Sequence, residues 1–114
     1  GEVLWQYVQE DVCDPEIRFC DPGISAPVTA ISGAVIAGHL DGFVRIYNGA
    51  TGEVMWEFDT TQDLQTVNGV AARGASISGA GPAISQGHVV INSGYGLYSH
   101  EPGNALLVFS VNGD

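Results

Sequence analysis

Short runs of alternating apolar and polar residues, separated by glycine-rich breaks, make up most of this chain. Two such runs, FVRIY at 43–47 and EVMWEF at 53–58, flank the sequence NGATG. Alternation over about five residues on each side of a break rich in Gly and Asn predicts a β-hairpin. Asn and Gly tolerate the positive φ angles that tight hairpin loops demand, so residues 48–52 suit the turn.

The same pattern predicts a chain of short strands and no helix, because no window of about 11 residues carries a helical apolar stripe. Residues 25–59 are expected to form a four-stranded antiparallel meander. Residues 60–81 form a long loop of small residues, which in a compact domain is usually functional or disordered. The predicted strands are 1–8, 25–31, 34–39, 43–48, 53–59, 82–85, 88–93 and 104–111. The fold class is therefore all-β.

Parts of this pattern occur twice. The opening GEVLWQY returns as GEVMWEF at 52–58, which places Trp5 and Trp56 in equivalent positions. PVTAISGAVIAG from Pro27 matches PAISQGHVVINSG from Pro82, and FVRIYN at 43–48 matches ALLVFS at 105–110. A repeat of about 40 to 50 residues with four strands is typical of a β-propeller blade.

The repeat predicts that residues 1–114 form a single propeller segment containing about as many strands as two blades. The predicted parts are the outer strand of a blade at 1–9, one complete blade at 24–60, an inter-blade loop at 61–81, and three strands of a further blade at 82–114. Two blades cannot close a ring, and an open pair leaves unpaired strand edges. We therefore expect the remaining blades of a longer parent chain, or further copies of this chain, to complete the assembly.

The net charge of the chain limits the kinds of molecule that it is expected to bind. The chain has 13 acidic residues against 3 basic ones and a formal net charge of −10. Nucleic acid and anionic membrane surfaces are excluded as partners because both require clustered Lys and Arg. The acidity suits solubility or a basic partner, and no run approaches the roughly 20 apolar residues of a membrane span.

Cys13 and Cys20 enclose the six residues DPEIRF. Two cysteines in a glycine-rich, lysine-poor β chain suit one local disulfide in an exported protein. Free thiols and metal ligation are the alternatives, and ligation lacks the accompanying Cys or His set of a zinc site.

The string DGFVRIYNGATGEVMWEFDT resembles the repeat of pyrroloquinoline-quinone-type propellers. Thr51, Gly52 and Trp56 fall on the T-G-x-x-x-W part of that motif, whereas Asn48 and Ile46 replace its Asp and Ala. The sequence from 67 to 96 and PGNALLVFSV at 102–111 are similar to the C-terminal end of polyvinyl-alcohol-dehydrogenase-like quinoproteins. The similarity covers nearly the whole chain from 23 onward.

This resemblance implies an eight-bladed, periplasmic or extracellular propeller. Such a protein oxidises an alcohol through bound pyrroloquinoline quinone, usually with calcium, and passes electrons to a cytochrome c. In that family the Trp packs between neighbouring blades, so a structural role is implied for four residues of this chain: Trp5, Trp56, Gly52 and Thr51.

Ligand-binding residues of a propeller lie on loops at one face, here 39–41, 60–81 and 94–104. Four polar residues on these loops are the predicted cofactor contacts: Asn68, Arg73, Ser76 and Asn104. A guanidinium at position 73 suits a quinone carboxylate, and a local ion pair is the alternative. The acids Asp41 and Asp63 and the histidines His39, His88 and His100 are interpreted as turn or surface residues. No catalytic residue is identified.

Three functions remain open at this point. The chain is a piece or subunit of a quinone-dependent alcohol dehydrogenase, a non-catalytic propeller scaffold, or a self-assembling extracellular structural protein that uses its open blade edges. Alone, it is expected to be inactive.

Overall fold

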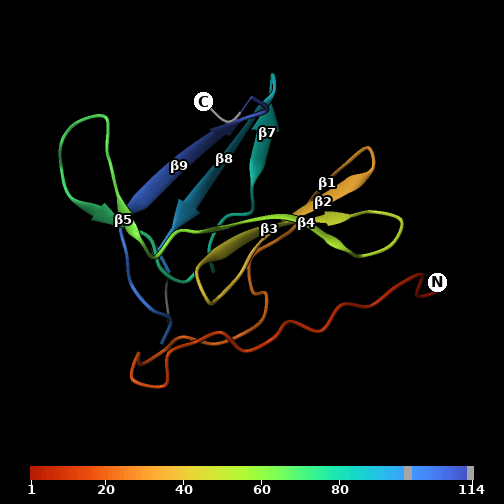
Figure 1. Cartoon of the computed structure of the whole chain (residues 1–114), viewed down its shortest axis with the longest axis horizontal. Helices are drawn as coiled ribbons and strands as arrows, with labels where there is room; N and C mark the ends of the chain where they lie inside the picture. Colours follow the sequence, from red (N-terminus) through yellow and green to blue (C-terminus); the bar gives the residue numbers. More distant parts are fainter. Residues whose placement is uncertain (97–98, 113–114) are drawn as a thin grey trace.

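The computed structural model describes residues 1–96 and 99–112, and within them all regular structure is strand (Figure 1). The all-β prediction is therefore confirmed. The end of the last predicted segment, 113–114, and residues 97–98 of the predicted loop 94–104 lie outside the described residues. The strands are β1 Thr29–Ile31, β2 Ala34–Gly38, β3 Phe43–Asn48, β4 Val54–Asp59, β5 Asp63–Leu64, β6 Ala72–Arg73, β7 Ala83–Ser85, β8 His88–Ser93 and β9 Ala105–Ser110.

The first sheet is four-stranded and antiparallel, with the order β1-β2-β3-β4, as the meander prediction required. β1 starts at Thr29, later than expected, because Pro27 cannot donate a backbone hydrogen bond to a sheet ladder. The predicted hairpin joins β3 to β4. Asn48 Oδ1 accepts the N–H groups of Ala50 and Thr51, which fixes the turn, and Gly52 adopts a positive φ of 76°.

The second sheet is three-stranded, with the order β7-β8-β9. Between the two sheets, the predicted loop 60–81 contains the small ladder β5-β6, in which Asp63 pairs with Arg73. Pattern reasoning did not predict this ladder, because a strand of two residues is too short to show alternation.

The two sheets pack face to face through an apolar core (Figure 1). Ile36 and Val44 of the first sheet meet Ile91 of the second, and all three are at most 1% exposed. The start of β7 is also tied to β1, because the Thr29 hydroxyl donates to the Pro82 carbonyl. Alternation along each strand thus assigns one face of each sheet to this shared core.

Aromatic rings extend the core between β4 and β9. The ring centroids of Trp56 and Phe109 lie 5.1 Å apart at an interplanar angle of 76°. Phe58 contacts the same Phe109 ring at 5.1 Å and 66°. Edge-to-face pairs at such distances contribute roughly 1 kcal/mol beyond the area that they bury. One phenylalanine of the second sheet therefore receives two aromatic side chains of the first.

The N-terminal segment, residues 1–9, lies on the opposite side of the first sheet (red in Figure 1). It was predicted to be the outer strand of a blade, but no other described strand lies beside it, so it runs without sheet pairing. Trp5 Nε1 donates to the Gly49 carbonyl at 2.9 Å, and the rings of Trp5 and Tyr7 lie 6.4 and 5.5 Å from Tyr47. A blade role for this segment stays a prediction.

The two groups of aromatic contacts are equivalent by sequence. When GEVLWQY is aligned with GEVMWEF, Trp5 is equivalent to Trp56 and Tyr7 to Phe58. When FVRIYN is aligned with ALLVFS, Tyr47 is equivalent to Phe109. Each Trp-x-aromatic pair thus contacts the same position of a sheet that follows it in the chain. The contacts repeat in position but not in ring geometry, since Trp5 stacks on Tyr47 at 27° whereas Trp56 meets Phe109 edge-to-face at 76°.

Cys13 and Cys20 form a disulfide, with their Cα atoms 5.7 Å apart. The local disulfide is thereby confirmed over the free-thiol and metal-ligand alternatives. It closes a small loop in residues 10–24, a segment without strands that leads from the N-terminal segment to the first sheet.

Replacing Phe109 by alanine should weaken packing between the sheets. Because Phe109 is half-buried and contacts two rings, we expect the F109A variant to lose about 2 to 3 kcal/mol of unfolding free energy in urea. Val70→Ala, at an exposed valine of the β5-β6 loop, should lose less than about 0.5 kcal/mol. Equal losses in the two variants would contradict the packing described here.

Candidate functional site

Three loops meet at the end of the molecule where β2, β4 and β8 end and β3 and β9 begin. We call this region, residues 39–42, 60–61, 73–77, 94 and 101–104, the loop junction. Backbone hydrogen bonds tie it together: Ile77 N–H donates to the His39 carbonyl, Ser76 N–H to that of Glu101, and Gly94 N–H to that of Ser76. The three loops predicted to share one face are therefore in contact.

Arg73 and Asn104 are neighbours in the loop junction. The Asn104 N–H donates to the Arg73 carbonyl at 2.9 Å, and the Arg73 N–H donates to Asn104 Oδ1 at 3.1 Å. Arg73 Nε also donates to the Thr61 carbonyl at 2.6 Å, and a terminal guanidinium nitrogen lies 3.6 Å from Glu101 Oε1. The guanidinium is half exposed, so some of its five donors can still contact a ligand.

Ser76 lies in the same junction but is fully buried. Its hydroxyl donates to the Leu40 carbonyl at 2.6 Å and accepts the Glu101 N–H at 3.1 Å. The Ser76 hydroxyl thus uses its donor and one acceptor position to join two loops. This indicates a structural role for Ser76 rather than contact with a ligand.

Asn68 lies away from this group. It is exposed in the loop between β5 and β6, where its Oδ1 accepts the Val70 N–H at 3.2 Å. This hydrogen bond across two residues is a local turn interaction. The structure thus brings together three of the four predicted cofactor contacts and leaves Asn68 outside.

Asp41 is occupied by a buried ion pair. Its carboxylate oxygens accept hydrogen bonds from both terminal nitrogens of Arg45, at 2.9 and 3.2 Å, and from the Phe43 N–H. Arg45 Nε donates in turn to Glu57 Oε2 at 3.1 Å. A buried pair with these hydrogen bonds holds Asp41 in a structural role, as its turn sequence predicted.

His39 is only 1% exposed, so its interpretation as a surface residue is wrong, whereas its carbonyl accepts the Gly42 N–H and so opens the turn, as interpreted. Its Nε2 is 2.9 Å from the Tyr47 hydroxyl. Burial, reinforced by the Arg45 charge and opposed by Asp41, lowers the pKa of His39 to about 4, so the ring is neutral at pH 7. Burial likewise raises the pKa of Tyr47 to about 12. The alternating pattern of β3 could have indicated that Tyr47 is buried. No feature of the sequence indicated that His39 is buried as well.

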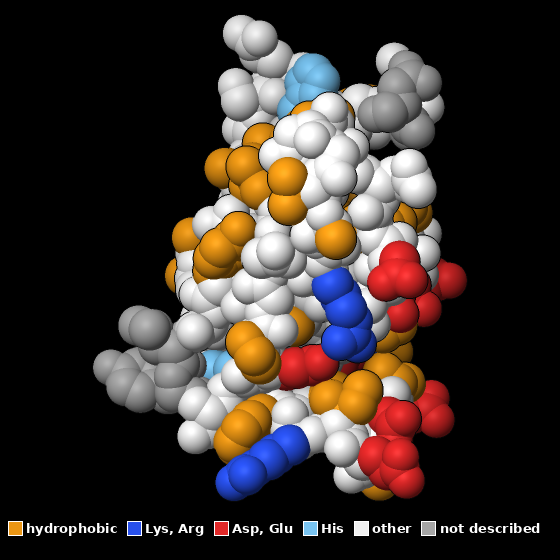
Figure 2. Space-filling model, turned by 90° about the vertical axis from the view of Figure 1, so that its left-hand side faces the viewer, with side chains coloured by type: hydrophobic (Ala, Val, Ile, Leu, Met, Phe, Trp, Pro, Cys, Tyr) orange, Lys and Arg blue, Asp and Glu red, His pale blue; other side chains and the backbone are white. Residues whose placement is uncertain are grey.

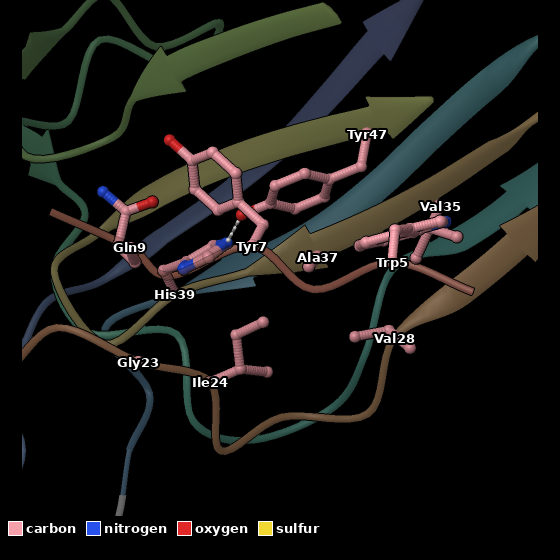
Figure 3. A pocket seen from close by; sticks show the side chains of 10 residues that line it. All are labelled: Trp5, Tyr7, Gln9, Gly23, Ile24, Val28, Val35, Ala37, His39 and Tyr47. Atoms are coloured by element: carbon pink, nitrogen blue, oxygen red, sulfur yellow. Dashed lines mark hydrogen bonds between the residues drawn. The ribbon is translucent and has the colours of Figure 1, made fainter. Parts of the chain in front are cut away.

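A cavity of about 370 Å³ lies between the N-terminal segment and the first sheet, on the side away from the second sheet. Figure 3 shows Trp5 and Tyr7 on one side of it, with Val35, Ala37 and Tyr47 on the sheet. Two buried polar atoms, His39 Nδ1 and Gln9 Oε1, have no hydrogen-bond partner among the described residues. The walls are otherwise mainly apolar, which suits packing of hydrocarbon side chains.

Figure 2 shows the molecule from the side of Figure 1 where β5 lies, with acidic side chains gathered along one edge and uncharged groups over much of the rest. Among residues 1–96 and 99–112, no three His, Cys, Asp or Glu side chains lie together in a way that could hold a metal ion. The same residues contain no helix long and apolar enough to span a membrane.

These features define a class: an all-β protein in which blade-like antiparallel sheets pack through repeated aromatic contacts. Comparison with known proteins adds the particular relatives. The chain is 36% identical, over an alignment of 125 positions that covers 99% of its length, to a polyvinylalcohol dehydrogenase of Sphingopyxis sp. (strain 113P3). It is 41% identical, over an alignment of 104 positions that covers 83% of its length, to a polyvinylalcohol dehydrogenase of a Pseudomonas species.

The resemblance to the polyvinyl-alcohol-dehydrogenase group is therefore confirmed as homology. The chain spans only 19% and 16% of the length of these two relatives. No family model matches the chain, and no solved structure matches it.

Protonation of His39 should make stability depend on pH. Because the folded-state pKa is near 4 and the ordinary value is 6.5, the unfolded chain binds the proton first as the pH falls. The full contribution is present above about pH 6.5, and about 3 kcal/mol should be lost as the pH falls to about 4.

Urea unfolding across this pH range checks the expectation. The difference in unfolding free energy between the native chain and the His39→Gln variant should shrink by that amount towards low pH. A difference that stays constant across this pH range would contradict a buried, neutral His39.

Proposed function

We propose that this chain supplies two blades to a larger propeller that oxidises the alcohol groups of a polyvinyl-alcohol-type substrate through pyrroloquinoline quinone. The observation that carries the proposal is the similarity to polyvinylalcohol dehydrogenases along 99% and 83% of the chain. The sheets of the chain, which pack as repeated units, are consistent with such an assembly. Because the chain spans less than a fifth of these relatives, activity is expected only from the complete assembly.

The residues of the loop junction fit part of this cofactor. Pyrroloquinoline quinone is an anionic, planar molecule that accepts two electrons and protons from an alcohol. The half-exposed Arg73 guanidinium can donate charge-assisted hydrogen bonds to a carboxylate, and the exposed Asn104 amide lies beside it. Ser76 and Asn68 do not fit as direct contacts, because the first is buried with its hydroxyl satisfied and the second lies in a separate turn.

Calcium and the catalytic base do not fit the described residues. Asp41 is closed off by Arg45, and no carboxylate cluster is present in residues 1–96 and 99–112. We therefore assign the base and any calcium ligands to other blades of the assembly. Electron transfer to a cytochrome c is likewise a function of the complete protein.

The disulfide and the relatives support a periplasmic or extracellular location, because disulfides persist in oxidising compartments.

A non-catalytic propeller scaffold is the second candidate function. It is favoured by one observation, the engagement of Asp41 and Ser76 in structural hydrogen bonds inside the loop junction.

Quinone titration separates the two candidates. With pyrroloquinoline quinone added to the complete assembly and absorbance recorded, the Arg73→Gln variant should bind the quinone about 10-fold or more weakly than the native protein, because a charge-assisted hydrogen bond is lost. The control Arg18→Gln removes the same charge from an exposed site in residues 10–24 and should bind as the native chain does. Equal affinities in both variants, or no binding at all, would favour the scaffold.

A further inference from the structure

The loop between β8 and β9, residues 94–104, is much longer than its counterpart in the first sheet. That counterpart, residues 39–42 between β2 and β3, is a tight turn in which the Gly42 N–H donates to the His39 carbonyl. The fold therefore needs only a short turn at this place. Residues inserted into one repeat of a repeat protein form a loop, and such loops often bind ligands. We call residues 94–104, of which 94–96 and 99–104 are described, the inserted loop.

The inserted loop is packed firmly on the segment that leads into β7. Ser76 contacts Glu101 twice: the Ser76 N–H donates to the Glu101 carbonyl at 3.2 Å, and the Glu101 N–H donates to the Ser76 hydroxyl at 3.1 Å. A Cβ on Gly103 would lie 2.6 Å from the Arg73 carbonyl oxygen, so the two backbones approach closely. Side chains between these two segments are therefore held in fixed positions beside the loop junction.

Two polar atoms between these segments have no hydrogen-bond partner among the described residues. They are Ser78 Oγ and His100 Nδ1, and both atoms are buried although their residues are only half-buried. Both side chains lie against Gly96, because a Cβ there would collide with Ser78 Oγ and lie 3.5 Å from His100 Cβ. A buried polar group without a partner costs about 1 to 3 kcal/mol, so native structures pair nearly all such groups.

The missing partner of these two atoms has to be small. The chain itself already covers both atoms, so a blade that packs on an open surface of this chain does not reach them. The absence of a side chain at Gly96 leaves space beside Ser78 Oγ, and a Cβ on Gly79 would meet only the Tyr95 carbonyl oxygen, at 3.8 Å. A small polar group can enter here by displacing part of the cover, and the glycines let the backbone adjust.

We propose that Ser78 Oγ and His100 Nδ1 bind a hydroxyl group of the alcohol substrate. A serine hydroxyl both donates and accepts, and an imidazole nitrogen does one or the other according to its tautomer. A ligand hydroxyl also donates and accepts, so it can pair with both atoms at once. The basic residues of the chain are Arg18, Arg45 and Arg73, so no further positive charge attracts an anion to this place. The inference deepens the proposed function and rests on it for the class of alcohol.

The two parts of the site then have different ligands. Arg73 and Asn104 contact a carboxylate of the quinone, as proposed above, whereas Ser78 and His100 hold a neutral hydroxyl group beside it. The pair transfers no proton or hydride, so the base remains with other blades. Its contribution is to fix the orientation of the carbon that bears the hydroxyl, since a reactant held in the right geometry reacts faster.

Binding of pentane-2,4-diol to the complete assembly without quinone, followed by saturation-transfer NMR, tests the proposal. This probe has the neighbouring secondary hydroxyl groups of a polyvinyl-alcohol-type chain. We expect Ser78→Ala and His100→Phe each to bind the diol about 3- to 10-fold more weakly than the native assembly, because one hydrogen bond is lost. Gly96→Ala should weaken binding as well, since its methyl group fills the space beside Ser78 Oγ. His100→Asn keeps a polar atom near the position of Nδ1 and should restore most of the affinity.

Matched controls remove the same groups at the opposite end of the second sheet. Ser85→Ala and His88→Phe change exposed residues where β7 ends and β8 begins, and both should bind the diol as the native assembly does. Equal diol affinities in S78A, H100F and the native assembly, or no diol binding by the native assembly, would overturn the proposal. Quinone affinity separates this failure from failure of the proposed function, because S78A and H100F should bind the quinone normally whereas Arg73→Gln should not.

Discussion

The packing of a tryptophan-bearing segment on an aromatic ring of the next sheet is the interaction on which this structure depends. Trp56 and Phe58 meet Phe109 edge-to-face across the two sheets, and Trp5 and Tyr7 contact Tyr47 from the equivalent sequence positions, with the Trp5 ring stacked. A sheet of three or four short strands cannot bury both of its faces by itself. Large rings that reach across the gap cover apolar area and also restrict how the sheets are oriented, because edge-to-face geometry is directional.

The loop junction follows from this packing. Once the two sheets lie face to face, their strand ends coincide, and the connecting loops must satisfy their backbone polar groups against one another. Ser76 does so with its own hydroxyl, and small residues permit the approach: a Cβ on Gly74 would collide with the Thr60 and Ser93 side chains. The polar groups left accessible, Arg73 and Asn104, are therefore held on a rigid frame.

Much of the fold was predictable from residue patterns. β3 and β8 begin and end at the predicted residues, because alternation and flanking glycines mark both ends of those strands. The disulfide followed from composition. The N-terminal segment has the sequence of a strand but no strand beside it, since pairing depends on a neighbour that local sequence does not reveal.

The candidate site was less predictable than the fold. Arg73, Ser76 and Asn104 were brought together as expected, yet whether a hydroxyl faces a ligand or a carbonyl depends on contacts distant in sequence, such as that of Ser76 with Leu40. The burial of His39 was missed for a similar reason. Its burial is set by packing of the sheet and N-terminal segment around it, and a lone histidine before a turn gives no sign of that.

The equivalence of the two aromatic contacts is the central claim, and a pair of double-mutant cycles tests it most directly. One cycle combines Trp56→Ala with Phe109→Ala, and the other combines Trp5→Ala with Tyr47→Ala. Equivalent packing predicts a favourable coupling energy of roughly 1 kcal/mol in each cycle, measured by urea unfolding. A coupling near zero for Trp5 and Tyr47, beside a clear coupling for Trp56 and Phe109, would contradict the claim.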